Sequence, residues 1–268
     1  MQPSSSSEVK QSDGLTRRLL GDIGAAAISA ALAAPFVAAI DTAITKNASG
    51  AMSLFPSLRE ELLVLQRKPL TYLTAPPFRW LWAVFFSTYA AANTANTLSR
   101  ANGMSHTMPV LVSSTAANMS SAMAKDSAFA KMYGVTAPRP VPLGSYGCFF
   151  MRDIVSMAFF FTLPPLLSAE LQARGAGKTT SDVSSQFLLP VAVQVVSNPW
   201  HLLGLNLYNE PKATAAERVQ TVKRQLPLTI VARMLRIVPA FSLGGSLNKT
   251  LREAVHGPAL EGNGKDVA

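Results

Sequence analysis

Long stretches without a charged residue alternate with short charged segments along the chain. A membrane-crossing helix needs about 20 mainly apolar residues. The uncharged runs at 23–40, 80–99, 101–124 and 183–209 are long enough alone. Those at 154–169 and 237–248 become long enough when the charged residues just before them are included. The pattern predicts six helices, at residues 18–46, 76–100, 105–130, 143–170, 184–207 and 227–252.

These helices predict an all-α membrane protein with six transmembrane helices in three pseudo-repeated hairpins. The membrane domain would cover residues 18–255, with repeats at 18–100, 101–170 and 184–252. The polar segments 1–17 and 256–268 are expected to be disordered tails. A soluble bundle of long core helices is the less favoured alternative, because so many of these helices are apolar all round.

Composition supports the membrane interpretation. Charged residues make up 15% of the chain, against about 25% in ordinary soluble domains. The single cysteine, Cys148, excludes an intrachain disulfide framework and a cysteine-cluster metal site.

The net charge of +9 is unevenly distributed. Segments 42–78, 125–151 and 205–232 each hold three or four basic residues against one or two acidic ones, a net charge of +2 apiece. The links between the second and third helices and between the fourth and fifth are nearly neutral. The charge bias therefore places the three basic segments on one face of the membrane and both termini on the other. Nucleic acid is not an expected partner, since aromatic residues are not interleaved with these charges.

Similar residues recur at intervals of about 80 positions, a period typical of internal repeats. Pro35 and Asn118 are 83 residues apart, and Asn118 and Pro199 are 81 apart. Arg152 and Arg236 are 84 apart. The recurrence indicates three units of two helices each around a pseudo-threefold axis.

Three hairpins, a proline late in an odd-numbered helix and an Arg-x-x-Pro motif in an even-numbered helix resemble the mitochondrial carrier family. Residues 232–241 look like the carriers' even-helix segment, and residues 152–161 look like its equivalent in the second repeat. The resemblance extends over residues 20–255 and includes carrier-like proteins of fungi. It implies a six-helix carrier fold that moves a metabolite by alternating access.

In carriers, each odd-numbered helix ends with a proline, an acid and a base. The acids and bases pair across the repeats and close one side of the cavity. Here His201 stands in place of an acid, and the second repeat lacks the proline. We therefore expect no three-way ion-pair gate. The positions that correspond to this incomplete signature are Pro35, Asp41, Lys46, Lys125, Asp126, Pro199 and His201.

Charged residues inside a predicted membrane helix are either functional or paired. We expect Arg152, Arg233 and Arg236 to contact an anionic solute, because arginine suits carboxylates and phosphates. For Arg152 the alternative is an ion pair with a neighbouring helix, for instance through Asp41. For the other two it is contact with anionic lipid head groups. Arg152 and Asp153 are adjacent, so we expect them not to pair with each other.

Asn93 and Asn118 are further candidates for solute contact, since both lie at predicted membrane depth. The favoured alternative is hydrogen bonding between helices. The histidines lack metal-ligand spacing and no catalytic triad is suggested, so we expect no enzyme activity, no cofactor and no metal. His201 is expected to be a packed interfacial residue rather than a proton relay.

Two functional hypotheses follow. The first is a multi-pass protein of a mitochondrial membrane, the inner one favoured over the outer, that transports an anionic metabolite. Its partners would be the lipid bilayer, including anionic head groups, and a small anionic solute. The second is a transport-inactive carrier fold that serves as a membrane interaction or protein-insertion platform, which the incomplete gate favours.

Overall fold

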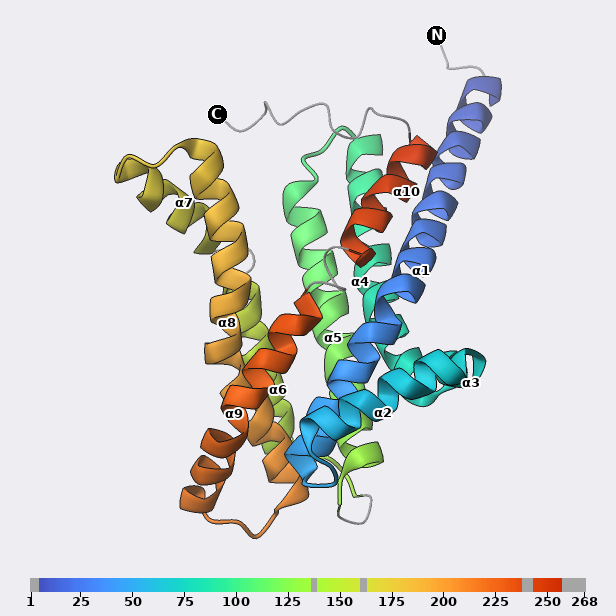
Figure 1. The fold of residues 1–268 in the computed structure, drawn as a ribbon. Coiled ribbons are helices and arrows are strands. Elements are labelled where there is room, and N and C mark those ends of the chain that lie inside the picture. The colour runs from blue at the N-terminus through green and yellow to red at the C-terminus, as the bar shows by residue number, and fades with distance from the viewer. Residues whose placement is uncertain (1–4, 136–138, 160–162, 238–242, 257–268) are drawn as a thin grey trace.

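The computed structural model describes residues 5–135, 139–159, 163–237 and 243–256 (Figure 1). These residues form α-helices without any strand, so the predicted all-α class is confirmed. The helices are α1 (Ser5–Ser49), α2 (Leu54–Arg67), α3 (Pro69–Thr74), α4 (Pro76–Ala101), α5 (Thr107–Tyr133), α6 (Leu143–Met157), α7 (Leu163–Ala173), α8 (Lys178–Asn209), α9 (Ala215–Ile237) and α10 (Ser246–His256).

Six helical segments form a closed ring. Helix α1 packs on α4, α4 on α5, and α5 on α6. Helices α6 and α7 both pack on α8, which packs on α9, and α9 and α10 return to α1. The three hairpins of the predicted repeat are therefore present, and the bounds of α4 match the predicted helix 76–100 within one residue.

The connections lie at the two ends of the ring as the charge pattern predicts. The turn after α1, residues 134–135 and 139–142, and the segment 210–214 lie at one end (Figure 1). The α4–α5 and α7–α8 links lie at the other end, beside the start of α1 and the end of α10. The three basic connections thus begin at the same end of the ring, and α2 and α3 of the first one extend from there along its side (Figure 1).

Several elements differ from the sequence prediction. The helix predicted at 143–170 is divided into α6 and α7, and the one at 227–252 into α9 and α10. The backbone takes π-helical turns at 158–159 and 243–245, next to these divisions. Pro239 and the rest of 238–242 lie outside the described residues.

The predicted connection 42–78 contains two helices that were not predicted, α2 and α3. Helix α2 places apolar residues on the ring, where Leu54 packs with Ala43 and Ile44, and Leu58 lies beside them. Charged residues between these apolar positions made the helical periodicity of this segment hard to recognise in the sequence.

The predicted tails overlap the described chain only in part. Residues 5–17 belong to α1 rather than to a disordered tail. Residues 1–4 and 257–268 lie outside the described part of the chain, so the rest of both expected tails stays a prediction.

Helix α1 buries its small side chains and exposes its large ones. Ala30, Ala34 and Ala38 are 0% exposed, whereas Ile28 is 55% and Leu32 43% exposed. Water-soluble proteins rarely expose a continuous row of large apolar side chains along one helix. Helices in a bilayer instead use small residues for close contact and present large apolar residues to lipid.

Two helices of the described chain, α1 over Gly14–Ser49 and α8 over Lys178–Asn209, are long and apolar enough to cross a membrane. The expectation of six such spans is therefore not confirmed. Helices α4 and α5 contain many Ser, Thr and Asn residues, and the other two segments are divided and contain arginines. These features lower the hydropathy of the four remaining ring segments.

Candidate functional site: a buried charge network

A single aspartate near the end of α1 connects three segments of the ring. Asp41 is 3% exposed, and its Oδ2 accepts a hydrogen bond of 2.8 Å from Lys125 Nζ of α5. Arg236 Nη1 of α9 lies 2.7 Å from Asp41 Oδ1 and 3.0 Å from Oδ2. One carboxylate therefore accepts hydrogen bonds from two cations and joins α1 to α5 and α9.

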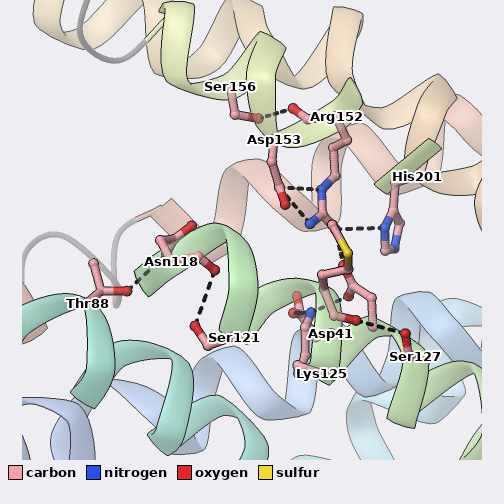
Figure 2. Close-up of polar contacts among 12 residues, drawn as sticks. Asp41, Thr88, Asn118, Ser121, Lys125, Ser127, Arg152, Asp153, Ser156 and His201 are labelled. Atoms are coloured by element: carbon pink, nitrogen blue, oxygen red, sulfur yellow. Dashed lines mark hydrogen bonds and ion pairs between the residues drawn. The ribbon is translucent and has the colours of Figure 1, made fainter. Parts of the chain in front are cut away.

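The network continues from α5 to α6. Lys125 Nζ lies 2.6 Å from Asp126 Oδ1, and Asp126 Oδ2 accepts a hydrogen bond from Arg152 Nη1. Arg152 also donates to Asp153 Oδ1, from Nε at 2.8 Å and from Nη2 at 2.6 Å (Figure 2). All four side chains are buried, so their attraction is weakly screened.

Helix α8 contributes a histidine to the same network. Arg152 Nη1 is 3.1 Å from His201 Nδ1, and Figure 2 shows the guanidinium between His201 and Asp153. A guanidinium can only donate, so Nδ1 accepts and the proton of the neutral ring lies on Nε2. We call the linked residues the central network: Asp41, Lys125, Asp126, Arg152, Asp153, His201 and Arg236.

Three buried groups beside this network have polar atoms without a partner among the described residues. They are Arg233 Nε on α9, Asp153 Oδ2 on α6, and both amide atoms of Asn198 on α8. Arg233 is 5% exposed and Asn198 is 0% exposed. Buried polar groups are nearly always hydrogen-bonded, so these exceptions need an explanation.

The network also has an excess of positive charge. Arg233 lies within electrostatic range of Asp41, Asp126 and the two neighbouring arginines. With Arg233 included, four basic side chains face three aspartates, which leaves one positive charge in excess when His201 is neutral. The site can therefore accept a negatively charged group.

A second buried network lies toward the opposite end of α1, and we call it the terminal network. Asp22 is 0% exposed; Arg252 Nε and His256 Nε2 of α10 lie 2.8 and 2.9 Å from its Oδ1. Thr97 of α4 donates to Asp22 Oδ2. Asn93 donates to the Asp22 carbonyl at 3.2 Å. These bonds hold α1, α4 and α10 together.

The structure revises one expectation about the predicted site residues. Arg152 and Asp153 do pair, because the long arginine side chain turns back along the helix and reaches the neighbouring carboxylate. Ion pairing between two odd-numbered segments is also present, since Asp41 of α1 bonds Lys125 of α5. From α8, the described contacts bring the histidine His201 to the network and no acid. The expectation that these residues form no three-way ion-pair gate therefore stays a prediction.

Other predicted positions lie outside the central network. Lys46 pairs with Glu61 of α2 at 2.9 Å, and the Pro35 carbonyl accepts a bond of 3.0 Å from the Tyr72 hydroxyl. Pro199 lies in α8, between Asn198 and the network histidine.

The two asparagine candidates bond to neighbouring helices. Asn93 exchanges hydrogen bonds of 2.9 and 3.0 Å with Asn248. Asn118 donates to Thr88 Oγ1 at 3.1 Å (Figure 2). These are the contacts of the interhelical alternative.

Sequence reasoning did not identify Asp22, Arg252, His256 or Asn198 as site residues. Asp22 lies directly before the uncharged run 23–40, inside the helix predicted at 18–46, and its place there indicates no partner. Its burial depends on α10, which is 230 residues away in the sequence. The sequence did contain one signal. Asp22 near the start of the first predicted helix and Arg252 at the end of the sixth are an acid and a base expected at the same membrane face.

The model of the family described as "probable citrulline exporter" matches residues 25–256, which is most of the chain. This is a different family from the mitochondrial carriers, so the expected carrier membership is wrong. Among curated proteins, none matches the chain. The family description supports a membrane location and transport.

Proposed function

Because the chain belongs to the probable citrulline exporter family, we propose that it moves a small metabolite across a membrane and that citrulline is its first candidate substrate. All six ring segments cross the bilayer in this proposal. The small-residue interface of α1 and its exposed large apolar residues support it.

The observation that carries the proposal is the pair of buried networks on α1. Asp22 and Asp41 are 19 residues apart, which at 1.5 Å per residue is about 28 Å along a helix. This is close to the hydrocarbon thickness of a bilayer, about 30 Å. The two networks therefore lie toward opposite ends of the ring.

Alternating access requires closures at both ends that open in turn. The central network joins α1, α5, α6, α8 and α9, and so closes the end that has the basic connections. The terminal network joins α1, α4 and α10 toward the other end. Separating the ion pairs at one end, while the other end stays closed, would expose a bound solute to one side only.

The structure changes the type of solute that we expect. Arg152 bonds two aspartates and Arg236 Nη1 bonds a third, so both guanidinium groups are partly occupied before an anionic metabolite could bind. Arg233 remains for one carboxylate. A solute with a single carboxylate and a donor group fits better than a polyanion.

The alternative of an insertion platform loses its main support. It was favoured by the absence of acid–base pairs between odd-numbered segments, and the Asp41–Lys125 bond supplies such a pair. The mitochondrial inner membrane was expected from the carrier resemblance and no longer has that support. Fractionation of cells that express a tagged chain tests the location separately.

Efflux from proteoliposomes tests the proposed function. Purified protein reconstituted into vesicles loaded with radiolabelled citrulline should release the label faster than protein-free vesicles. Asp41→Asn, which weakens the central closure, should change the rate. Glu170→Gln, which removes an exposed pair with Arg174, is the matched control. Citrulline release no faster than from empty vesicles, by protein that still unfolds cooperatively, would overturn the proposal.

A further inference from the structure

The three groups with unpartnered atoms come from three different helices that meet at the central network. Arg233 lies one turn before Arg236, which bonds Asp41. Asn198 lies one turn before His201, which contacts Arg152. Since residues three apart share a helix face, both side chains are on the faces that meet the network. Asp153 is part of it.

These groups differ chemically in a way that suggests a single ligand. Arg233 offers a cationic hydrogen-bond donor without a carboxylate in salt-bridge range among the described residues. Asp153 uses Oδ1 for Arg152 and leaves Oδ2 as a negatively charged acceptor. Asn198 offers one acceptor and one amide donor, both unused.

We propose that Arg233, Asp153 and Asn198 form the recognition site for an α-amino acid whose side chain ends in a carbamide or carboxamide. Arg233 binds the α-carboxylate, and Asp153 Oδ2 accepts from the α-ammonium. Asn198 exchanges hydrogen bonds with the terminal amide, whose C=O and N–H groups complement its own. This assignment rests on the proposed export function and names the residues that choose its substrate.

The charge of the site excludes competing amino acids. A side chain that ends in an ammonium would add a second cation to a network that already has a positive excess. It would also leave the carbonyl of Asn198 as its only partner at that position. Burial makes such an uncompensated charge unfavourable. The site should therefore favour citrulline over ornithine, which has the same backbone groups and an ammonium terminus.

Substitution of the buried residues Arg233 and Asn198 should not destabilise the protein, unlike substitution of most buried polar residues. A buried arginine without an ion-pair partner destabilises the empty protein, so Arg233→Met should retain or raise the melting temperature. Arg236→Met breaks the bond to Asp41 and should lower it. Asn198→Leu removes two unpartnered polar atoms and should not lower it, since an apolar side chain of similar size leaves no buried polar atom unpaired there.

Thermal-shift titration of the purified full chain tests the site, because a ligand that binds the folded state raises its melting temperature. L-Citrulline should stabilise the wild-type protein, and citrulline amide and N-acetylcitrulline should bind at least tenfold more weakly. Arg233→Met should lose the citrulline response. Asn198→Leu should bind citrulline at least tenfold more weakly and should discriminate less between citrulline and norvaline.

The outcomes distinguish a wrong assignment of the site from a wrong assignment of the function. If citrulline is transported and both variants still bind it as the wild type does, the site is wrong and the export function stands. If ornithine stabilises the wild type as well as citrulline does, the assigned role of Asn198 is overturned. If the folded wild-type protein neither binds nor transports citrulline, the proposed function fails and the site fails with it.

Discussion

At the residue scale, Asp41 is the acid on which the central network most depends. Two cations from different helices, Lys125 and Arg236, bond its carboxylate. In a buried site, removal of one partner leaves the others desolvated and uncompensated. Asp41 therefore contributes both to the stability of the ring and to the closure of one end.

Substitution of this carboxylate should destabilise the protein strongly. We expect Asp41→Asn to lower the free energy of unfolding by about 3–5 kcal/mol, the usual effect of breaking a buried ion pair. Thermal unfolding of the purified protein in detergent measures the change. The control, Glu170→Gln, breaks an exposed pair and should change it by less than about 1 kcal/mol. Equal shifts for the two variants would contradict a structural role for the network.

At the element scale, α6 and α8 cross closely at a glycine. A Cβ added at Gly204 would lie 2.6 Å from Phe149 Cε1, and Phe149 is 0% exposed. The Ser145 hydroxyl also bonds the Gly204 carbonyl at 2.7 Å. The contact between these helices therefore needs a residue without a side chain at position 204.

An added methyl group at this crossing should be unfavourable. We expect Gly204→Ala to lower stability by about 1–3 kcal/mol, as overpacking of a close contact does. Gly147 of α6 has open space around its Cβ position, so Gly147→Ala should leave stability unchanged or raise it by up to about 1 kcal/mol. The melting temperatures of the two variants, compared with the wild type, measure both stability changes. A stable Gly204→Ala protein would show that the helices separate easily.

The start of α9 is held by a reciprocal capping box. The Glu217 carboxylate accepts from the Thr214 backbone N–H at 2.6 Å and from its hydroxyl at 2.8 Å. The Glu217 N–H donates to Thr214 Oγ1 at 3.4 Å. These bonds, the backbone one first, lower the pKa of Glu217, which lies in the exposed first turn of the helix.

Loss of the cap should loosen α9 in a pH-dependent way. We expect Thr214→Ala to lower helix stability by about 1 kcal/mol. A lowered carboxyl pKa means that the folded protein gains stability above the unfolded pKa and loses it as the pH falls through the folded one. The difference between wild type and variant should therefore shrink in acid. Amide hydrogen exchange of residues 215–220 at neutral and acid pH measures it, and a constant difference would argue against the carboxylate.

At the scale of the whole molecule, the ring has two chemically different ends. The connections at one end contain the basic surplus, and the links at the other end are short and nearly neutral. Exposed apolar side chains lie on α1 and α8 between these ends. In the proposed function, the protein crosses a bilayer with its basic end on the positively favoured side.

Site-directed labelling tests this topology. Cys148 is the single cysteine of the chain and is buried, so Cys148→Ala supplies a background without thiols. Ser105→Cys and Lys178→Cys should react with an impermeant maleimide from one membrane face. Ala51→Cys and Lys212→Cys should react from the opposite face only. Labelling of Ser105→Cys and Lys212→Cys from the same face would contradict six crossings.

The sequence alone determined the parts of this protein that depend on local composition. Uncharged runs predicted the six ring segments, because a helix that meets lipid or its neighbours over its whole length excludes charge. The segment 76–100 and the sidedness of the basic connections follow from that rule. The amphipathic α2 was missed because its charged face resembles a solvated loop.

Only the tertiary structure decided which charges meet. Asp41 bonds residues 84 and 195 positions away, and Asp22 bonds one 230 positions away. Such pairs depend on the rotation and depth of each helix in the ring, which side-chain packing sets and residue spacing does not. The same packing buried Arg233, Asp153 and Asn198 at the network. Some of their polar atoms stay without a partner among the described residues because the neighbouring network residues pair with one another.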